Sequence, residues 1–294
     1  MNWAIQTILF LLGLAVGSFL NVFILRYDPS QKFFSFRRTL GRSQCPGCSK
    51  TLAWYELVPL LSYFLQRGKC RSCETSLSLQ YPLVELLSGV AFVFVPLRIE
   101  QLLLLSPFFA NIWVIAGLSA IWIAVALLLV AVFLVDVRYF IIPNSVNAAL
   151  AALGAIWTVA LLLVRFPAGM GAGSFLFNFA PLFPIFSTVW ANHLLGLGVG
   201  FVLFLIIVLA SLGKGMGMGD VKLIASLGLL FGWPDIMVVM LVSFILGAVL
   251  AVWSLLIGKK KMSDQIPFGP IIVIAAGLVF FGGAGLASLY LGIL

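Results

Sequence analysis

Two of the few acidic residues in this sequence stand at the ends of apolar runs. Only nine of the 294 residues are Asp or Glu. Asp136 closes the run AVALLLVAVFLVD, and Asp220 follows the glycine-rich stretch GKGMGMG. A central Asp in a membrane helix costs roughly 2.5 to 3.5 kcal/mol on insertion scales, so such residues usually face a cavity and serve a function. These two aspartates are the first candidates for chemistry.

Two carboxylates brought together in a poorly solvated site would share a single proton, because like charges repel each other there. The ionised member can then activate water while the protonated member polarises a peptide carbonyl, which suffices for peptide hydrolysis without a metal. Glycines before Asp220 would allow an extended substrate to approach closely. The catalytic candidates are Asp136 and Asp220, and the residues expected to support the site or bind substrate are Gly217, Gly219, Lys222 and Glu85.

Each aspartate also has a purely structural interpretation. Asp136 could pair with the neighbouring Arg138 at the membrane interface. Asp220 could pair with Lys214 or Lys222, or it could cap the helix that it begins. The glycines that precede Asp220 favour the functional interpretation there.

Two further polar residues lie within apolar stretches. Glu85 could be a buried structural acid or part of a polar cavity. His193 is the only histidine, and no HExxH or GxSxG pattern is present. These absences exclude zincin-type and nucleophile-elbow hydrolases at the level of motifs and favour a helix-interface role for His193.

The second candidate site consists of cysteine side chains. The four cysteines form two CxxC pairs separated by 21 residues. This spacing is typical of a four-thiolate zinc site in a ribbon-like fold. Two disulfides are the alternative, but cytoplasmic thiols are kept reduced, which favours zinc. Because four thiolates fill the coordination shell, the expected ion is structural and would stabilise a loop too small for a core. The ligands would be Cys45, Cys48, Cys70 and Cys73.

The elements that must position these residues are membrane helices. A hydrophobic content of 63%, a charged content of 9% and a mean hydropathy of +1.20 exclude an ordinary soluble domain. A membrane helix needs roughly 20 mainly apolar residues. The first such stretch has no basic segment before it and is expected to be a retained anchor. The seven stretches lie at about 3–25, 80–97, 110–136, 145–164, 190–212, 236–257 and 268–292.

The distribution of basic residues orients these helices. The net charge is +8, but nine of the 17 Lys and Arg lie between Arg26 and Arg71, and three form the run 259–261. This clustering favours contact with anionic lipid over nucleic-acid binding. Short basic loops stay in the cytoplasm, so the loop 26–78 is expected there, with both aspartates near the same face. Keeping 259–261 on that side requires an eighth, short span at 220–233.

The sequence therefore predicts an all-α polytopic membrane protein with about eight transmembrane helices and a small cytoplasmic zinc-ribbon-like loop domain. The chain is expected to divide into three regions. These are a first transmembrane helix at 1–25, a cytoplasmic zinc-binding domain with four cysteines at 26–78 and a transmembrane aspartyl protease core at 79–294. Residues 166–188 are rich in Phe, Pro and Gly and are expected to form an outer loop or interfacial segment.

Motifs along nearly the whole chain resemble, in order, those of the bacterial prepilin peptidases, a family of GxGD-type aspartyl proteases. One departure is Asn144, since an Asp often follows the Ile-Pro in this family. A lone GxGD or CxxC is a weak signal, whereas the ordered combination is specific. The motifs are GSFLNVFILR at 17–26, the paired CxxC loop, ELVPLLSYFLQRGKCRSC at 56–73, YPLVELLSG at 81–89, Asp136 followed by IIPN, GMGMGDVKL at 215–223 and PFGP at 267–270.

The resemblance implies a bifunctional enzyme of the bacterial cytoplasmic (inner) membrane with its active site near the cytoplasmic face. Such enzymes cleave the leader of type IV prepilins and pseudopilins, which serve type IV pili and protein secretion, and many then methylate the new N-terminus with S-adenosylmethionine. By motif match, Asp136 and Asp220 take the protease roles, and the cysteines match a loop associated with methyl transfer.

Two other classes of function remain open at this point. A proton- or cation-coupled transporter could use the same aspartates, but it leaves the cysteine loop unexplained. A membrane anchor or assembly factor could use that loop to recruit partners. The expected partners of the enzyme are a prepilin or pseudopilin substrate and membrane lipid, with no nucleic acid.

Overall fold

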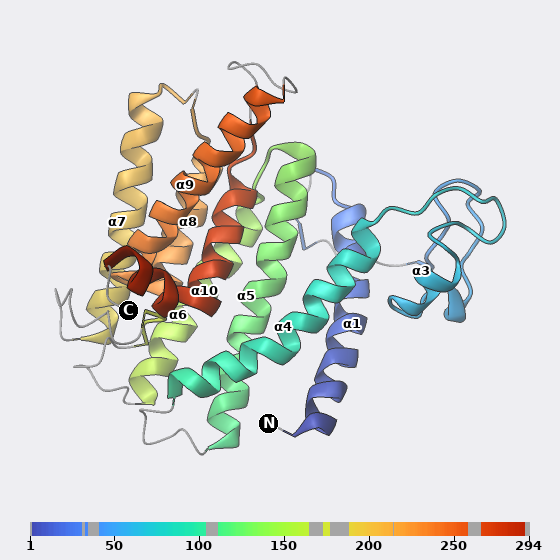
Figure 1. Ribbon diagram of the computed structural model, residues 1–294, viewed down its shortest axis with the longest axis horizontal. Helices are drawn as coiled ribbons and strands as arrows, with labels where there is room; N and C mark the ends of the chain where they lie inside the picture. Colours follow the sequence, from blue (N-terminus) through green and yellow to red (C-terminus); the bar gives the residue numbers. More distant parts are fainter. Residues whose placement is uncertain are drawn as a thin grey trace. The chain divides into compact units, whose positions relative to one another are not determined.

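The computed structural model describes most of the chain, and within that part the regular elements are helical. Two isolated β-bridges occur in the cysteine loop. The described residues are 2–30, 33–34, 41–103, 111–164, 173–176, 188–213, 215–257 and 266–291. The elements, labelled in Figure 1 except for the short η1, are α1 (Trp3–Leu25), η1 (Trp54–Glu56), α3 (Leu61–Leu65), α4 (Gln80–Leu103), α5 (Ile112–Tyr139), α6 (Asn144–Leu163), α7 (Val189–Ala210), α8 (Met218–Phe231), α9 (Asp235–Leu256) and α10 (Gly269–Leu291).

Seven of the described helices are long and apolar enough to cross a membrane, namely α1, α4, α5, α6, α7, α9 and α10. They correspond to the seven predicted stretches, and the all-α, multi-pass membrane fold is confirmed. The largest difference is in α4, which continues through Pro96 to Leu103, beyond the expected end at 97. In this last part of the helix, Arg98 donates to two backbone carbonyl groups.

The short helix expected between Asp220 and Trp233 is present as α8, which has 14 residues. At 1.5 Å per residue it is about 21 Å long, less than the roughly 30 Å of a bilayer's hydrocarbon core. This is why hydropathy alone does not find it, and why the alternation of basic loops was needed to predict it. The basic run 259–261 and most of 166–188 lie outside the described residues.

The chain divides into two compact units. Unit 1 comprises Met1–Leu97 with Trp122–Ala131, and unit 2 comprises Arg98–Ile121 with Val132–Leu294. Unit 1 thus contains the cysteine loop, and unit 2 contains both candidate catalytic aspartates. Each unit is described below by itself.

In unit 1, small residues bring α1 and α4 into close contact. A Cβ added to Gly13 would lie 2.7 Å from the carbonyl oxygen of Ser88, and one added to Gly17 would lie 2.7 Å from the Ser88 hydroxyl. The side-chain amide of Asn21 on α1 also donates to the carbonyl of Tyr81 on α4 at 3.2 Å. Glycines at such crossings let membrane helices pack backbone to backbone. The two ends of the cysteine loop are therefore held together by their helices.

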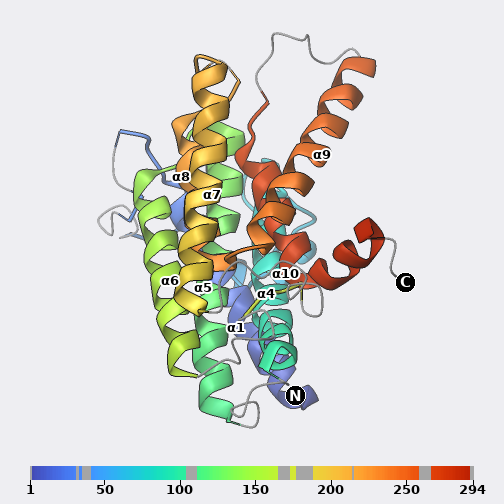
Figure 2. The same ribbon diagram turned by 90° about the vertical axis from the view of Figure 1, so that its left-hand side faces the viewer.

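In unit 2, α8 is the enclosed element and packs on α6 and α7 (Figure 2). Nine of its 14 residues are buried. A Cβ added to Gly196 of α7 would lie 2.5 Å from the carbonyl oxygen of Gly228 on α8, so the two backbones touch. His193 of α7 is 1% exposed, and its Nδ1 lies 2.9 Å from the carbonyl oxygen of Leu229. His193 is thus an interface residue between α7 and the C-terminal part of α8.

Candidate active site

Asp136 lies near the C-terminal end of α5 and is only 5% exposed. Its Oδ2 accepts a hydrogen bond of 3.0 Å from the backbone amide of Gly269, the first residue of α10. Free amides at a helix N-terminus point toward anions, which makes this a favourable place for a carboxylate. A Cβ added to Gly269 would lie 2.6 Å from the same oxygen, so the contact requires glycine. The PFGP motif therefore supplies a partner of Asp136.

Asp220 is the third residue of α8 and is 9% exposed. Its Oδ2 accepts from the backbone amide of Gly217 at 3.2 Å, so the carboxylate caps its own helix. The capping interpretation is therefore correct as a description of structure. It does not exclude chemistry, because a carboxylate has about four acceptor positions and the cap uses one of them.

The two aspartates, 84 positions apart in sequence, come together in unit 2. Both side chains are at least nine-tenths buried, at 5% exposed for Asp136 and 9% for Asp220. Ile142, from the IIPN motif, lies beside both of the adjoining glycines. A Cβ on Gly219 would be 3.3 Å from Cβ of Ile142, and one on Gly269 would be 3.3 Å from its Cδ1. The arrangement can hold one proton between two buried carboxylates, as general acid and base work on a peptide bond requires.

The start of α6 is tied to the start of α8 beside this pair. Lys222 is exposed, and its Nζ donates to Oδ1 of Asn144 at 2.8 Å. The side-chain amide of Asn147 donates to the carbonyl of Gly219 at 3.4 Å. Lys222 thus reaches from α8 to α6, and Lys214, the other lysine considered as a partner of Asp220, lies outside the described residues.

Glu85, the remaining supporting candidate, belongs to unit 1. It is 6% exposed, and its Oε2 accepts from the backbone amide of Leu60 at 2.8 Å. Leu60 has a φ of +58°, a left-handed conformation that non-glycine residues rarely adopt. Glu85 therefore anchors a turn of the cysteine loop to α4, and it also lines a cavity in this unit.

The four cysteines converge within the loop. Their sulfur atoms all lie within 4.8 Å of one another, and none is in a disulfide. Those of Cys45 and Cys73 are 3.6 Å apart. Zn–S bonds of about 2.3 Å in a tetrahedron place the sulfurs about 3.8 Å apart. The cluster could hold a metal ion, and the disulfide alternative is not formed.

The two CxxC pairs are built alike. The amide of Cys45 donates to Lys50 at 3.0 Å, and that of Cys70 donates to Thr75 at 2.9 Å. The residue after the second cysteine has a φ of +56° in both pairs. In both, the amide two residues after the first cysteine donates to its sulfur, at 3.4 and 3.5 Å. We call these two turns the knuckles (residues 44–51 and 69–76), each closed by one of the β-bridges.

Hydrogen bonds to two of the knuckle sulfurs favour thiolates, whereas the pKa of Cys48 is raised to about 11, because a backbone hydrogen bond from Lys50 is outweighed by the side chain of Cys73, by burial and by Cys45. Hydrogen bonds from the hydroxyl and the amide of Thr75 lower the pKa of Cys73 to about 6. Backbone amides of Cys48 and Gly47 lower the pKa of Cys45. The thiolate is the form that binds metals, so the two downward shifts prepare the cluster for an ion.

One buried acid was not found by sequence reasoning. Asp235 is 0% exposed and accepts from the hydroxyl of Ser174 and, at 2.6 Å, from the amide of Phe175. Arg98 donates to the carbonyls of Phe175 and Phe280 at 3.2 and 2.8 Å. These residues hold the described part of the 166–188 segment against unit 2.

Comparisons with known proteins agree with the motifs. The family model of the bacterial peptidase A24 N-terminal domain matches residues 11–99, and that of the type IV leader peptidase family matches 122–252. A prepilin leader peptidase/N-methyltransferase of Xanthomonas campestris pv. campestris is 31% identical over 305 residues, which cover 95% of this chain and 92% of that protein. Its namesake in Bacillus subtilis (strain 168) is 29% identical, with 97% of each chain covered.

A third relative, from Aeromonas hydrophila, bears the same name and is 29% identical over 98% of this chain and 94% of its own. No solved structure matches the chain. The N-terminal model covers most of α1, the cysteine loop and most of α4, and the second model covers both aspartates. The chain therefore belongs to the type IV leader peptidase family, and the resemblance read from its motifs is confirmed.

Proposed function

We propose that this protein is an aspartic endopeptidase that cleaves the leader peptide from type IV prepilins or pseudopilins and then N-methylates the mature product. The observation that carries the peptidase is the buried pair Asp136 and Asp220, each held by a backbone amide at a helix N-terminus. The names of the relatives supply the substrate class and the second activity. None of the relatives reported above is named as a transporter, so the transporter alternative gains no support.

The mechanism follows from one proton shared by two carboxylates. The ionised member accepts a proton from water, whose oxygen attacks the scissile carbonyl carbon, while the protonated member donates to the carbonyl oxygen. As the carbon–nitrogen bond breaks, a proton passes from the pair to the leaving amine. The amides of Gly217 and Gly269 keep the two carboxylates in place throughout.

Three neighbours of the pair support it in this proposal. Gly217 leaves room beside Asp220, since even a Cβ there would be 3.7 Å from Oδ2 of Asp220, and an extended substrate backbone can use that room. Gly219 fits against Ile142. Lys222 acts as a positioning residue, because its bond to Asn144 links α8 to α6.

The ion that suits the four cysteines is zinc, with a structural role. The thiolate cluster has the size of a tetrahedral site and no open position for substrate, and the ion would join the two knuckles. S-adenosylmethionine supplies the methyl group for the second reaction when it is bound. The chain's own part is to bind the donor and present the new amino terminus to it.

The proposed location is the bacterial inner membrane, with the active site near its cytoplasmic face. The nine basic residues between Arg26 and Arg71 support this orientation, because short basic loops are retained in the cytoplasm. They also fit contact with anionic lipid headgroups, and nucleic acid is not a proposed partner.

Asparagine substitutions test the peptidase. Asp136→Asn and Asp220→Asn keep side-chain size but cannot ionise, so each should lower prepilin cleavage by at least about 10²- to 10⁴-fold. Cleavage would be followed by mass spectrometry with purified protein. The matched control is Asp28→Asn, an exposed aspartate in unit 1, which should cleave normally. Normal cleavage by either active-site variant would refute the pair as the catalytic centre.

A further inference from the structure

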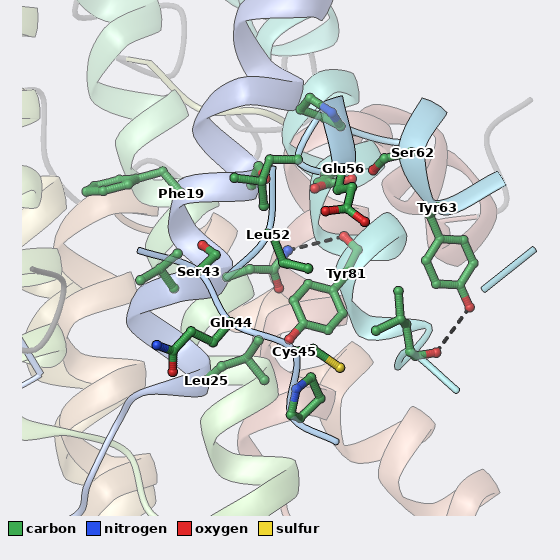
Figure 3. Close-up of a pocket in the computed structure, with 18 of the residues that line it drawn as sticks. Phe19, Leu25, Ser43, Gln44, Cys45, Leu52, Glu56, Ser62, Tyr63 and Tyr81 are labelled. Carbon is green, nitrogen blue, oxygen red and sulfur yellow. Dashed lines mark hydrogen bonds between the residues drawn. The ribbon is translucent and has the colours of Figure 1, made fainter. Parts of the chain in front are cut away.

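A cavity of about 560 Å³ lies in unit 1, between α1, α4 and the cysteine loop (Figure 3). Its wall includes Cys45 and Cys70, one from each knuckle, and residues of both helices. The volume falls within the roughly 300–1,000 Å³ that is usual for sites binding small molecules and cofactors. No role assigned so far, whether peptide cleavage or metal binding, uses this space.

The cavity contains a buried acceptor that lacks a donor. Asn21 lines it and is 1% exposed. Its side-chain amide nitrogen donates to Tyr81, but its Oδ1 has no hydrogen-bond partner among the described residues. Buried polar atoms are nearly always paired, and an exception calls for a ligand or water that completes it. A ligand with an N–H or O–H group would satisfy Asn21.

The charges of the wall favour a cation. Two carboxylates line it, Glu56 and Glu85, against one basic residue, Arg26. Each carboxylate uses one oxygen to hold the loop backbone, since Glu56 accepts from Ala53 and Glu85 from Leu60, both at 2.8 Å. Other acceptor positions remain on both groups. Burying such groups is favourable when a positive charge joins them.

Aromatic rings complete the set. Phe19, Tyr63 and Tyr81 line the cavity, and Figure 3 shows the ring of Tyr81 near Cys45. Aromatic faces stack on planar bases and attract cations. The ligand that fits these features combines a planar base with hydrogen-bond donors, a positive charge and a carboxylate.

We propose that this cavity is the binding site of S-adenosylmethionine. The sulfonium and ammonium groups lie toward Glu85 and Glu56, the adenine stacks on the aromatic rings, and Oδ1 of Asn21 accepts from a donor of the ligand. The carboxylate of the ligand has Arg26 as its counter-charge. The inference rests on the methyltransferase half of the proposed function and adds the place where the donor binds.

The position of the cavity also links the knuckles to methyl transfer. Cys45 and Cys70 are buried and form part of the wall, so an ion held by their sulfurs fixes that wall. Loss of the ion would release both knuckles and open the cavity. Binding of S-adenosylmethionine should therefore require the metal, although the metal takes no part in the reaction.

Calorimetry on the full-length protein in lipid nanodiscs tests the site. We expect Glu85→Gln to weaken the binding of S-adenosylmethionine at least tenfold. The binding of S-adenosylhomocysteine, which lacks the sulfonium charge, should weaken by a smaller factor. Tyr81→Leu should weaken the binding of both ligands. Two substitutions on α4 outside the cavity serve as controls. Glu100→Gln matches Glu85→Gln, and Phe94→Leu matches Tyr81→Leu. Both control variants should bind the two ligands normally. Zinc content and the thermal midpoint would check that each variant is folded.

Photocrosslinking supplies a second measurement that needs no variant. Irradiation of the wild-type protein with radiolabelled S-adenosylmethionine, followed by peptide mapping, should place the label on peptides spanning 15–26, 43–70 or 77–85. Label found only elsewhere would overturn the assignment. So would normal S-adenosylmethionine binding by both Glu85→Gln and Tyr81→Leu.

The outcomes separate this inference from the proposed function. If the wild-type protein cleaves prepilin but neither binds nor uses S-adenosylmethionine, the methyltransferase half and the site both fail. If it methylates but the label lies outside the cavity, only the site fails. Asp220→Asn should bind S-adenosylmethionine normally, so an error in the peptidase assignment would leave this result unchanged.

Discussion

The backbone amide of Gly269 donates to Oδ2 of Asp136 across 133 positions of sequence, at 3.0 Å. The bond joins the first residue of α10 to the end of α5, and a Cβ at Gly269 would collide with the carboxylate. The geometry of the candidate catalytic pair thus depends on a residue with no side chain of its own. The glycine of the PFGP motif is therefore required for this contact with Asp136.

Gly269→Ala should therefore reduce catalysis without preventing folding. The added methyl group would lie 2.6 Å from Asp136 Oδ2 and must displace it. A misplacement of about 1 Å can cost on the order of 10²-fold, so we expect kcat for prepilin cleavage to fall about 10- to 100-fold with little change in KM. Gly277→Ala is the control, because a Cβ at Gly277 of the same helix meets nothing within 4 Å. Equal activity of the two variants would contradict the role given to Gly269.

The interface between α7 and α8 should be intolerant of a single methyl group. Gly196→Ala would place Cβ 2.5 Å from the carbonyl oxygen of Gly228, and overpacking of this kind costs about 1–3 kcal/mol. Gly198→Ala on the same helix adds Cβ to open space and serves as the control. Thermal unfolding in detergent should show a lower midpoint for Gly196→Ala only. Because α8 carries Asp220, the variant should also lose activity at temperatures where the control is active.

The bond between Lys222 and Asn144 should contribute modestly to catalysis. Lys222 is exposed, so we expect Lys222→Met to cost about 0.5 to 1 kcal/mol, or roughly two- to fivefold in kcat/KM. Asn144→Asp replaces the neutral acceptor by a carboxylate and should preserve activity. A double-mutant cycle with Asn144→Ala would isolate the pair. Additive losses in that cycle would show that the two side chains act separately.

Removal of metal should unfold the knuckles and leave the peptidase core intact. Chelation, or Cys73→Ser, should release zinc and expose residues 41–79 to limited proteolysis, with Ser49→Ala as the control. Because Thr75 lowers the pKa of Cys73 to about 6, its thiolate persists above that pH, and protons compete with the ion as the pH falls through it. Zinc retention measured across about pH 5 to 8 should therefore decline at the acidic end. Stable zinc binding by Cys73→Ser would contradict the four-thiolate site.

Much of the fold was predictable because the bilayer imposes a length on each helix. Seven apolar stretches matched seven helices, and the placement of basic loops predicted α8 where hydropathy could not. The spacing of the cysteines predicted their convergence. These features depend on local sequence or on the alternation of loops between the two sides of the membrane. The continuation of α4 past Pro96 did not follow from either, because it depends on distant carbonyl groups that bind Arg98.

The sequence singled out the two candidate aspartates but not the residues that contact them. Scarcity of acids singled out Asp136 and Asp220, whereas Gly269 and Ile142 became relevant only when α10 and the IIPN segment packed beside them. Asp235 was missed because an Asp after Trp-Pro is typical of a turn. Its burial depends on Ser174 and Phe175, which lie 61 and 60 positions away in a segment without periodicity.

The two amides that hold the aspartates also set the charge balance of the site. Each helix N-terminus is equivalent to roughly +0.5 of an elementary charge, and α8 and α10 both begin here. Together they offset about one negative charge, which is the charge of Asp136 and Asp220 when the pair holds one proton. The protonation state needed for hydrolysis is therefore also the one that leaves this buried region close to neutral, so the working form of the pair carries little electrostatic penalty beside a bilayer.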